Sequence, residues 1–314
     1  MENNIKVSVC IVTYNQIQFI ESCLLSVVNQ NCDFNFEILV GDDCSTDGTR
    51  ERIIELAEKY PEMIRPILRT SNVGVAKNIV ELYKLAKGEY IAHLDGDDLM
   101  RENKLKMQVE ILENKRDVFY CTHDMAVIDG DGEVIQESYR AWPQGEYGII
   151  DLLSQLPFFA HSSKVFRNVD GSEFWDNLFH VDLVDIETHF EQVKKGNIYH
   201  IDSKLGCYRA KIGISVKSKK VNPILPKATR KIFTNYLKDK PSKKVKKLYA
   251  KAILAYAYQS GVLGDKLMAK EYSVESFRIG YYSKVQLVFL TLCFSPLLLT
   301  LFIKVINNMR RRKK

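Results

Sequence analysis

Apolar and polar positions follow two distinct periods along the first hundred residues. Four short apolar runs have the length of buried strands, and they cover residues 7–12, 37–40, 64–68 and 90–94. Between them, apolar residues recur at helical spacing in residues 17–28, in a segment with Ile53, Ile54 and Ala57, and in residues 75–86. Asp47 is a candidate cap for the middle helix. This order predicts a doubly wound, mainly parallel α/β sheet.

The pattern is looser after residue 115. Residues 118–128 are expected to form a strand that turns at residues 129–132 into a hairpin, and residues 182–195 a helix that stops at Gly196. Two short strands are predicted at residues 199–201 and 206–209. The segment that follows, from about residue 223 to 282, has helical composition with abundant Lys and Ala. The α/β region is therefore followed by a helical extension.

Three polar clusters follow the first, second and fourth predicted strands. They are Thr13-Tyr14-Asn15, Asp42-Asp43 and Asp95-Gly96-Asp97-Asp98. In an open parallel sheet, ligands bind beyond the carboxyl ends of the strands. Three clusters on one rim therefore predict a ligand site.

The Asp95-Gly96-Asp97 sequence is suited to hold a divalent cation beside a diphosphate. Mg²⁺ and Mn²⁺ are held by one or two carboxylates together with substrate phosphates, and the glycine lets the backbone come close. Each motif taken alone also fits a simpler structure. The aspartates could form a plain turn, and the Asp42-Asp43 segment could form an Asx turn with a helix cap. The spacing of an EF-hand calcium loop is absent.

Composition is that of a globular protein in a reducing compartment. Hydrophobic residues make up 46% and charged residues 27% of the 314 residues, which argues against disorder. The seven cysteines show no CxxC pairs and are expected to be free thiols. The polar start of the chain shows no secretory signal, so we expect a cytoplasmic location.

Five segments in the first 110 residues follow one another in a specific order: residues 9–15, 37–49, 72–78, 87–91 and 94–98. This series resembles the large inverting glycosyltransferase family 2, with its GT-A fold. A weaker match covers residues 185–196 and 208–215. The resemblance implies a GT-A catalytic domain in residues 1–215. Within it, residues 1–115 would bind a nucleotide-sugar and residues 116–215 would form the acceptor side.

The resemblance also implies roles for the residues on the donor side. Thr13, Tyr14 and Asn15 would border the nucleotide base, with the Tyr14 ring available for stacking. Asp43 would accept a hydrogen bond from the base, as members of the family often do with uracil. Lys77 would lie near the diphosphate.

The remaining roles concern the metal and the proton transfer. Asp95 would lie near the ribose and the metal, and Asp97 would be the main ligand of Mn²⁺ or Mg²⁺. Asp185 aligns with the catalytic base, which deprotonates the acceptor hydroxyl as the sugar carbon becomes cation-like. Asp182 and Glu187 are rival candidates for the base.

Two positions depart from the family pattern, and several other side chains have open roles. Val184 stands where a Glu is usual, and Lys211 where a His is frequent; Lys211 could contribute charge in its place. His180 and His189 lack the spacing of a zinc pair and are interpreted as surface or acceptor-groove residues. Other candidates for the acceptor region are Trp142, Phe158, Phe159, the segment 161–163 and Trp175, although core packing is the simpler role for most of the aromatic residues.

The end of the chain is expected to associate with a membrane. Residues 285–303 carry no charge, contain a Ser-Pro break, and are followed by a basic tail. The predicted units are a basic helical extension in residues 216–283 and a membrane-associating segment in residues 284–314. Whether that segment spans the bilayer or lies in its interface stays open. Residues 217–251, in which Asp239 is the one acid, would face anionic headgroups or form a solvated surface.

These observations predict a hexosyltransferase-like enzyme. It is expected to transfer a UDP-linked sugar to a saccharide or lipid-linked saccharide in bacterial-type polysaccharide synthesis, at the cytoplasmic side of the membrane. Two alternatives remain: a catalytically inactive membrane scaffold of the same fold, or a basic nucleic-acid-binding protein. Neither nucleic-acid motifs nor a Gly-rich phosphate loop near residues 8–30 is present in the sequence. Oligomeric state, sugar and linkage are not encoded in these motifs.

Overall fold

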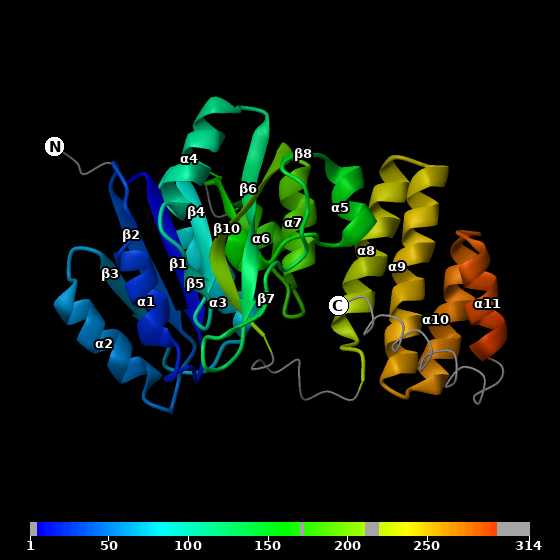
Figure 1. The fold of residues 1–314 in the computed structure, drawn as a ribbon, viewed down its shortest axis with the longest axis horizontal. Helices are drawn as coiled ribbons and strands as arrows, with labels where there is room; N and C mark the ends of the chain where they lie inside the picture. Colours follow the sequence, from blue (N-terminus) through cyan, green and yellow to red (C-terminus); the bar gives the residue numbers. More distant parts are fainter. Residues whose placement is uncertain (1–4, 170–172, 211–219, 294–314) are drawn as a thin grey trace. The chain divides into compact units, whose positions relative to one another are not determined.

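The computed structural model describes residues 5–169, 173–210 and 220–293. The chain divides into two compact units, shown in Figure 1. One consists of Met1–Ile149 and Pro157–Ile212, and the other of Ile150–Leu156 and Gly213–Lys314. The short segment Ile150–Leu156 thus groups with the C-terminal helices, although it lies inside the range 116–215 assigned from the sequence to the acceptor side.

The first unit begins with four parallel strands and the helices that connect them. In chain order these are β1 (Val7–Thr13), α1 (Ile20–Val28), β2 (Phe36–Asp42), α2 (Thr49–Lys59), β3 (Ile64–Leu68), α3 (Val75–Leu85) and β4 (Tyr90–Asp95). Strand β1 pairs in parallel with β2 on one side and β4 on the other. All seven of its residues are buried, which explains its continuous apolar sequence.

The second half of this unit adds antiparallel strand pairs, which make the sheet mixed. Its elements are β5 (Leu99–Met100), α4 (Lys104–Asn114), β6 (Val118–Ile128), β7 (Val134–Gln136), β8 (Gly145–Tyr147), η1 (His161–Ser163), β9 (Val165–Arg167), α6 (Glu173–Leu178), α7 (Asp185–Val193) and β10 (Asn197–Arg209). The strand order is β3-β2-β1-β4-β9-β6-β10-β5, with β7 beside β6 and β8 beside β10. Strand β9 runs antiparallel to both of its neighbours, β4 and β6.

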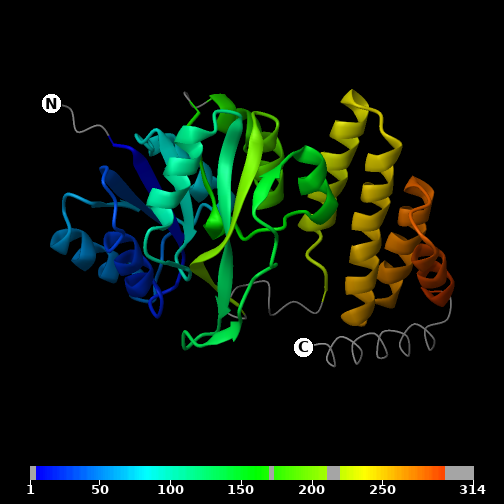
Figure 2. The same cartoon turned by 45° about the horizontal axis from the view of Figure 1, so that its top comes forward.

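Helices cover both faces of the sheet (Figures 1 and 2). Val9 and Ile11 of β1 join one buried cluster with residues of α1, α2 and α4. Successive strand residues point to opposite faces, so Cys10 faces the other side, where its Sγ lies 3.9 Å from the carbonyl oxygen of Leu82 in α3. The ring of Tyr83 in α3 packs against Trp175 of α6 on that face.

The two short strands predicted at residues 199–201 and 206–209 are one strand, β10, so that part of the prediction was wrong. The exposed pair Asp202 and Ser203 interrupts the apolar pattern, and this interruption suggested a gap between two strands. The structure accommodates it by shifts in the β6–β10 register between Ile201 and Lys204 and between Lys204 and Cys207. Such irregularities keep a strand continuous while bending it.

The second unit is helical. It contains most of α5 (Ile149–Gln155) and then α8 (Ile224–Asp239), α9 (Lys243–Val262), α10 (Lys266–Ile279) and α11 (Lys284–Cys293). Ser242 and Asp265 cap α9 and α10 by accepting hydrogen bonds from Val245 and Met268. Helices α8 and α9 lie side by side, with the rings of Phe233 and Tyr249 stacked 5.0 Å apart between their centroids (Figure 2).

Most of the apolar segment predicted to associate with a membrane lies in residues 294–314, outside the described part of the chain. Its first residues form α11. Among the helices that the structure describes, none is both long enough and apolar enough to cross a membrane.

Candidate functional site

The ends of β1, β2 and β4 lie side by side at one edge of the sheet. Thr13 is in register with Asp42, and Val12 with Asp95. The chain leaving β2 then returns a hydrogen bond to β1, from the Asp43 N–H to the Thr13 carbonyl at 3.0 Å. The Gly96 N–H donates to the Val12 carbonyl at 2.9 Å. The three polar clusters predicted from sequence are therefore adjacent in space.

The segment after β1 is held by the segment after β2. Asn15 has a positive φ of 52°, a conformation that Asn tolerates well. Its N–H donates to Ser45 Oγ at 2.9 Å, and its Oδ1 accepts from the Thr46 N–H at 2.9 Å. Thr13 is buried, whereas the Tyr14 side chain stays 43% exposed and is free to stack on a ligand. These contacts hold residues 13–15 against the segment after β2 and leave the Tyr14 ring exposed.

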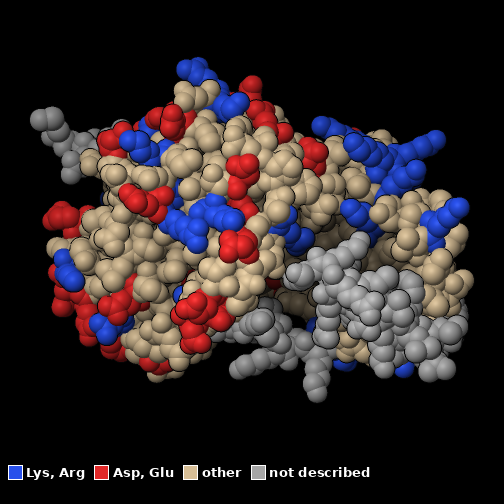
Figure 3. Space-filling view, viewed as in Figure 1, with Lys and Arg blue, Asp and Glu red and all other residues tan. Residues whose placement is uncertain are grey.

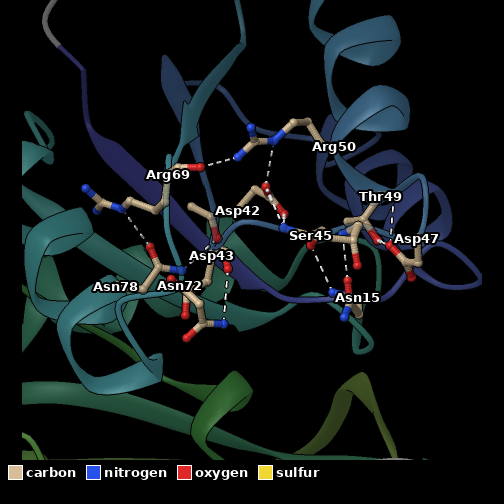
Figure 4. A network of polar contacts seen from close by, with 12 residues as sticks. Asn15, Asp42, Asp43, Ser45, Asp47, Thr49, Arg50, Arg69, Asn72 and Asn78 are labelled. Atoms are coloured by element: carbon tan, nitrogen blue, oxygen red, sulfur yellow. Dashed lines mark hydrogen bonds and ion pairs between the residues drawn. The ribbon is translucent and has the colours of Figure 1, made fainter.

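The Asp43 carboxylate is buried and turned toward the segment before α3 (Figure 4). Its two oxygens accept hydrogen bonds from the backbone N–H groups of Val73 at 2.7 Å and Gly74 at 3.0 Å. Asn72 Nδ2 also donates to the Asp43 carbonyl at 3.2 Å. Asp43 thus ties the end of β2 to the Asn-x-Gly turn, in addition to any contact with a base.

The neighbouring Asp42 has a structural role. Its buried carboxylate accepts hydrogen bonds from the Ser45 N–H and, at 3.1 Å, from Arg50 Nε (Figure 4). Lys77 lies apart from this network: its side chain is about half exposed, and its Nζ is 3.7 Å from Glu81 Oε1 one turn later in α3. The structure therefore joins Asp43 to the β1 cluster but leaves Lys77 at the surface.

The acidic turn after β4 packs tightly against β1. A Cβ on Gly96 would lie 2.6 Å from Gln16 Oε1 and 2.8 Å from Thr13 Cβ, so this position requires glycine. The Asp95 side chain is 39% exposed, and its oxygens contact His93 Nε2 at 3.2 Å and Ser162 Oγ at 3.3 Å. Although desolvation opposes it, these two partners hold the pKa of Asp95 below its usual value.

Two of the three carboxyl groups in this turn, those of Asp97 and Asp98, have raised pKa values. Burial, with the negative charge of Asp95, raises the pKa of Asp97 to about 6. Burial, with the charges of Asp95 and Asp97, also raises the pKa of Asp98. Three carboxyl groups in one turn thus repel each other, and a bound cation would relieve that repulsion.

The oxygen ligands that the acidic turn offers fit Mg²⁺ or Mn²⁺. Both ions prefer oxygen ligands, and Mg²⁺ sites commonly use one or two carboxylates with waters and substrate phosphates. Asp95 and Asp97 supply such a pair. In the described part of the chain, no group of three or more His, Cys, Asp or Glu side chains is arranged to hold a metal.

Arg209 fixes the acidic turn from the end of β10. Its N–H donates to Asp98 Oδ1 at 2.7 Å, and its Nε donates to the Asp97 carbonyl at 2.9 Å. Its Nη1 reaches the carbonyls of Asp129 and Gly130 in the hairpin turn. The guanidinium also lies 4.6 Å from the centroid of the Phe19 ring. One side chain thus connects four segments around the predicted metal ligands.

Asp185 is the first residue of α7, and its Oδ1 accepts the Ile186 N–H at 2.8 Å. Burial raises its pKa, and the charge of Asp95 acts in the same direction, while Lys164 and His93 act against them. Of the rival bases, Glu187 is buried and accepts hydrogen bonds from His180 at 3.0 Å and the Val184 N–H at 3.4 Å. The charge of the acidic turn thus acts on Asp185.

Comparison with known proteins identifies the family of this chain. A family model described as "Glycosyl transferase family 2" matches residues 8–170. The chain belongs to glycosyl transferase family 2. The family predicted from the ordered motifs is thereby confirmed.

Curated relatives include the uncharacterized protein Rv1520 of Mycobacterium tuberculosis, 31% identical over 64% of this chain and 58% of its own length. The putative teichuronic acid biosynthesis glycosyltransferase TuaG of Bacillus subtilis is 36% identical over 37% of this chain and 45% of its own. Abequosyltransferase RfbV of Salmonella typhimurium is 30% identical over 43% and 40%. The matched region thus spans about half of the length of these relatives.

The fold is shared with solved structures of another protein. Residues 1–349 of TarS from S. aureus, crystallised in complex with UDP, align over 99% of this chain and 92% of that chain with a TM-score of 0.66 and 18% identity. This likeness confirms the mixed α/β sheet of GT-A type.

A buried cluster of polar rings, which was not predicted from the sequence, lies beside β4 and η1. His93 of β4 stacks on His161 at 3.8 Å between ring centroids, and its Nδ1 lies 2.8 Å from the Tyr83 hydroxyl. His189 meets His161 edge-on at 5.0 Å. His189 is therefore a buried residue and not a groove histidine; the one available signal was a polar residue on an otherwise apolar strand at His93. Lys211 lies outside the described residues.

Proposed function

We propose that this protein is an inverting, metal-dependent glycosyltransferase that acts on a nucleotide-sugar, with UDP as the carrier. The observation that carries the proposal is the convergence of the β1, β2 and β4 ends on one acidic edge. A sugar transfer of this type requires a surface that binds the donor, carboxylates that hold the metal, and a general base.

The donor would lie along the edge formed by β1 and β2. The exposed Tyr14 ring offers a surface on which the base would stack, and Thr13 and Asn15 flank Tyr14 in the chain. Asp43, held by Val73 and Gly74, presents a fixed acceptor for a base N–H. Structures of TarS with UDP and with UDP-GlcNAc support a uridine donor in a protein of this fold.

Asp97 and Asp95 would hold Mn²⁺ or Mg²⁺ against the diphosphate, and Lys77, which is at the surface of α3, would supply a positive charge to it. The ion would offset the negative charge that gathers on the leaving diphosphate. The chain's own residues prepare this position: Gly96 allows close packing on β1, and Arg209 holds the Asp97 backbone.

Asp185 would act as the general base. It accepts the proton of an acceptor hydroxyl, whose oxygen forms a bond to the sugar C1 as the C1–phosphate bond breaks and its electron pair leaves with the nucleotide. A carboxyl whose pKa is raised holds a proton better than an ordinary one, which suits this step. The Ile186 N–H keeps the carboxylate oriented at the start of α7.

The acceptor would be a saccharide or lipid-linked saccharide of a bacterial cell-surface polysaccharide. Relatives named for teichuronic acid biosynthesis and for abequose transfer support this class. We also propose a location at the cytoplasmic side of the membrane. It is supported by an exposed group at the α8–α9 turn, hereafter the lysine cluster, made of Lys238, Lys240, Lys243, Lys244, Lys246 and Lys247 (Figure 3).

Transfer from a panel of nucleotide-sugars, measured with Mn²⁺ or with EDTA, tests the proposal. The variants are Asp97→Ala and Asp185→Asn, with Asp182→Asn as the matched control. We expect metal-dependent turnover of one donor, reduced about a hundredfold or more in both variants and unchanged in the control. Binding of UDP without turnover of any donor would instead favour an inactive scaffold, and retention on DNA without UDP binding would favour a nucleic-acid-binding protein.

A further inference from the structure

Lys164 is a completely buried lysine that contacts the helix on which the proposed catalytic base stands. It lies between η1 and β9 and has no exposed surface. Its Nζ is 2.9 Å from Gln192 Oε1, to which it donates, and 3.1 Å from His189 Nδ1. The ammonium also lies 4.9 Å from the centroid of the Phe166 ring and 5.9 Å from that of Tyr120. Burying a charged group costs free energy unless hydrogen bonds or charged partners compensate for it.

The partners of Lys164 share one face of α7 with Asp185. Residues 185, 189 and 192 stand at positions i, i+4 and i+7, which align along one side of a helix. The side of α7 that presents Asp185 is therefore the side that Lys164 holds. Truncating this lysine would leave two polar groups of α7 without their partner in the protein interior.

The segment that contains Lys164 also contacts the acidic turn and β4. Ser162, two residues before Lys164, contacts the Asp95 carboxylate, and the Lys164 carbonyl accepts the His93 N–H at 3.1 Å. The segment 161–164 thus touches the predicted metal ligand on one side and α7 on the other.

We propose that Lys164 is a positioning residue for the proposed reaction: through Gln192 and His189 it places Asp185 opposite the acidic turn, and through its charge it keeps that carboxylate available to accept a proton. This inference rests on the proposed function of Asp185. It assigns a purpose to a buried lysine that donor and metal binding do not use.

The charges around the pair set the direction of the effect. Burial lowers the pKa of Lys164 to about 7, while the negative charge of Asp185 raises it again. In turn, burial and Asp95 raise the pKa of Asp185, and Lys164 and His93 lower it. Four neighbouring groups complete the surroundings: His161 and His189, whose pKa values burial lowers, and Tyr83 and Tyr120, whose pKa values burial raises.

The sign follows from these shifts. Below pH 7 Lys164 is charged and opposes protonation of Asp185, so its loss raises the pKa of Asp185 further. Above pH 7 the lysine is neutral in the native protein as well, so its loss changes the charge at Asp185 little. The effect of Lys164→Met on proton acceptance is therefore largest at acidic pH and declines toward pH 9.

The direct test is a carboxyl NMR titration of the full-length protein with ¹³C-labelled aspartate, in which Asp185→Asn assigns the signal. We expect the Asp185 pKa to rise in Lys164→Met and to stay unchanged in Lys106→Met, an exposed lysine that pairs with Asp33 at the surface. Gln192→Leu, which keeps the charge and removes one contact, should shift it less. An Asp185 pKa that is identical in native protein and Lys164→Met overturns the inference.

Turnover then separates this inference from the proposed function. With the donor that the native protein uses, we expect kcat of Lys164→Met to fall about tenfold or more at pH 6 and to approach the native value at pH 9, with KM for the donor within about threefold. UDP affinity equal to the native value shows that the variant is folded. A pH-independent loss of kcat overturns the charge role. Absence of turnover in the native protein counts against the proposed function, whereas the NMR titration still decides the role of Lys164.

Discussion

Ser162 contacts Asp95 twice, once at the backbone and once at the side chain. Its Oγ accepts the Asp95 N–H at 3.1 Å and lies 3.3 Å from Asp95 Oδ2, to which it donates. The two residues are 67 positions apart in the chain. Ser162 is fully buried. It supports the predicted metal ligand and is not exposed to an acceptor, the role considered for it from sequence.

Replacing Ser162 by Ala should weaken cation and donor binding. The Ser162 hydrogen bond helps to hold the pKa of Asp95 low, so its loss raises that pKa and lowers the affinity of Asp95 for a cation. We expect several-fold weaker Mn²⁺ activation in a metal titration of activity. The control is Ser163→Ala, which is also buried but donates to the Ala160 carbonyl. Equal effects of the two variants would contradict a specific role for Ser162.

Adding a methyl group at Gly96 should distort the acidic turn. A Cβ there would lie 2.6 Å from Gln16 Oε1, and the neighbouring Thr13 Cβ is at 2.8 Å on the rigid end of β1. Gly96→Ala is expected to cost about 1–3 kcal/mol in the free energy of unfolding, measured by urea denaturation, and to weaken UDP binding. Gly130→Ala, where a Cβ meets nothing within 4 Å, should change neither. A Gly96→Ala protein as stable as native would refute the packing argument.

Asp97 makes cation binding depend on pH. Its pKa is raised to about 6 in the folded protein, so folding favours the protonated form; the associated stability is present at low pH and is lost as pH rises through 6. A cation replaces the proton above that pH. Thermal denaturation should therefore show a Mn²⁺-induced rise in Tm at pH 7.5 that is much smaller at pH 5. Asp97→Asn should abolish the rise, and an undiminished rise in that variant would exclude Asp97 as a ligand.

Asp43→Asn separates the two roles of this carboxylate. An amide cannot accept from both Val73 and Gly74 in the native geometry, so the variant should lose about 1.5–3 kcal/mol of unfolding free energy. If Asp43 also binds the base, UDP affinity measured by calorimetry should fall at least about tenfold. Asp33→Asn, at a side chain that is 71% exposed, is the control. Reduced stability with native UDP affinity would limit Asp43 to the turn.

The lysine cluster should bind anionic vesicles. Each lysine near an anionic surface contributes about 1 kcal/mol, so changing Lys243, Lys244, Lys246 and Lys247 to Gln should weaken sedimentation with phosphatidylglycerol vesicles at least about tenfold. The control changes four exposed lysines elsewhere: Lys59, Lys106, Lys115 and Lys194. High salt should reduce binding of the native protein. Native-like binding by the cluster variant would place the membrane contact elsewhere.

Local pattern determined much of this protein. The fully buried β1 produced a continuous apolar run, and the ends of β1, β2 and β4 were marked by polar clusters because parallel strands end at one edge. The order of those clusters also identified the family. Each of these features is written in residues that are close in sequence, so it can be recognised without knowing the tertiary structure.

Contacts between distant residues were decided only by the tertiary structure. Nothing near Ser162 in sequence indicates that it meets Asp95, and nothing near Lys164 indicates that it supports α7. The continuity of β10 through Asp202 likewise depends on register shifts against β6. The physical reason is the same in each case: the partner of a buried polar group is chosen by how strands and helices pack, and packing is not visible in the local period of apolar and polar residues.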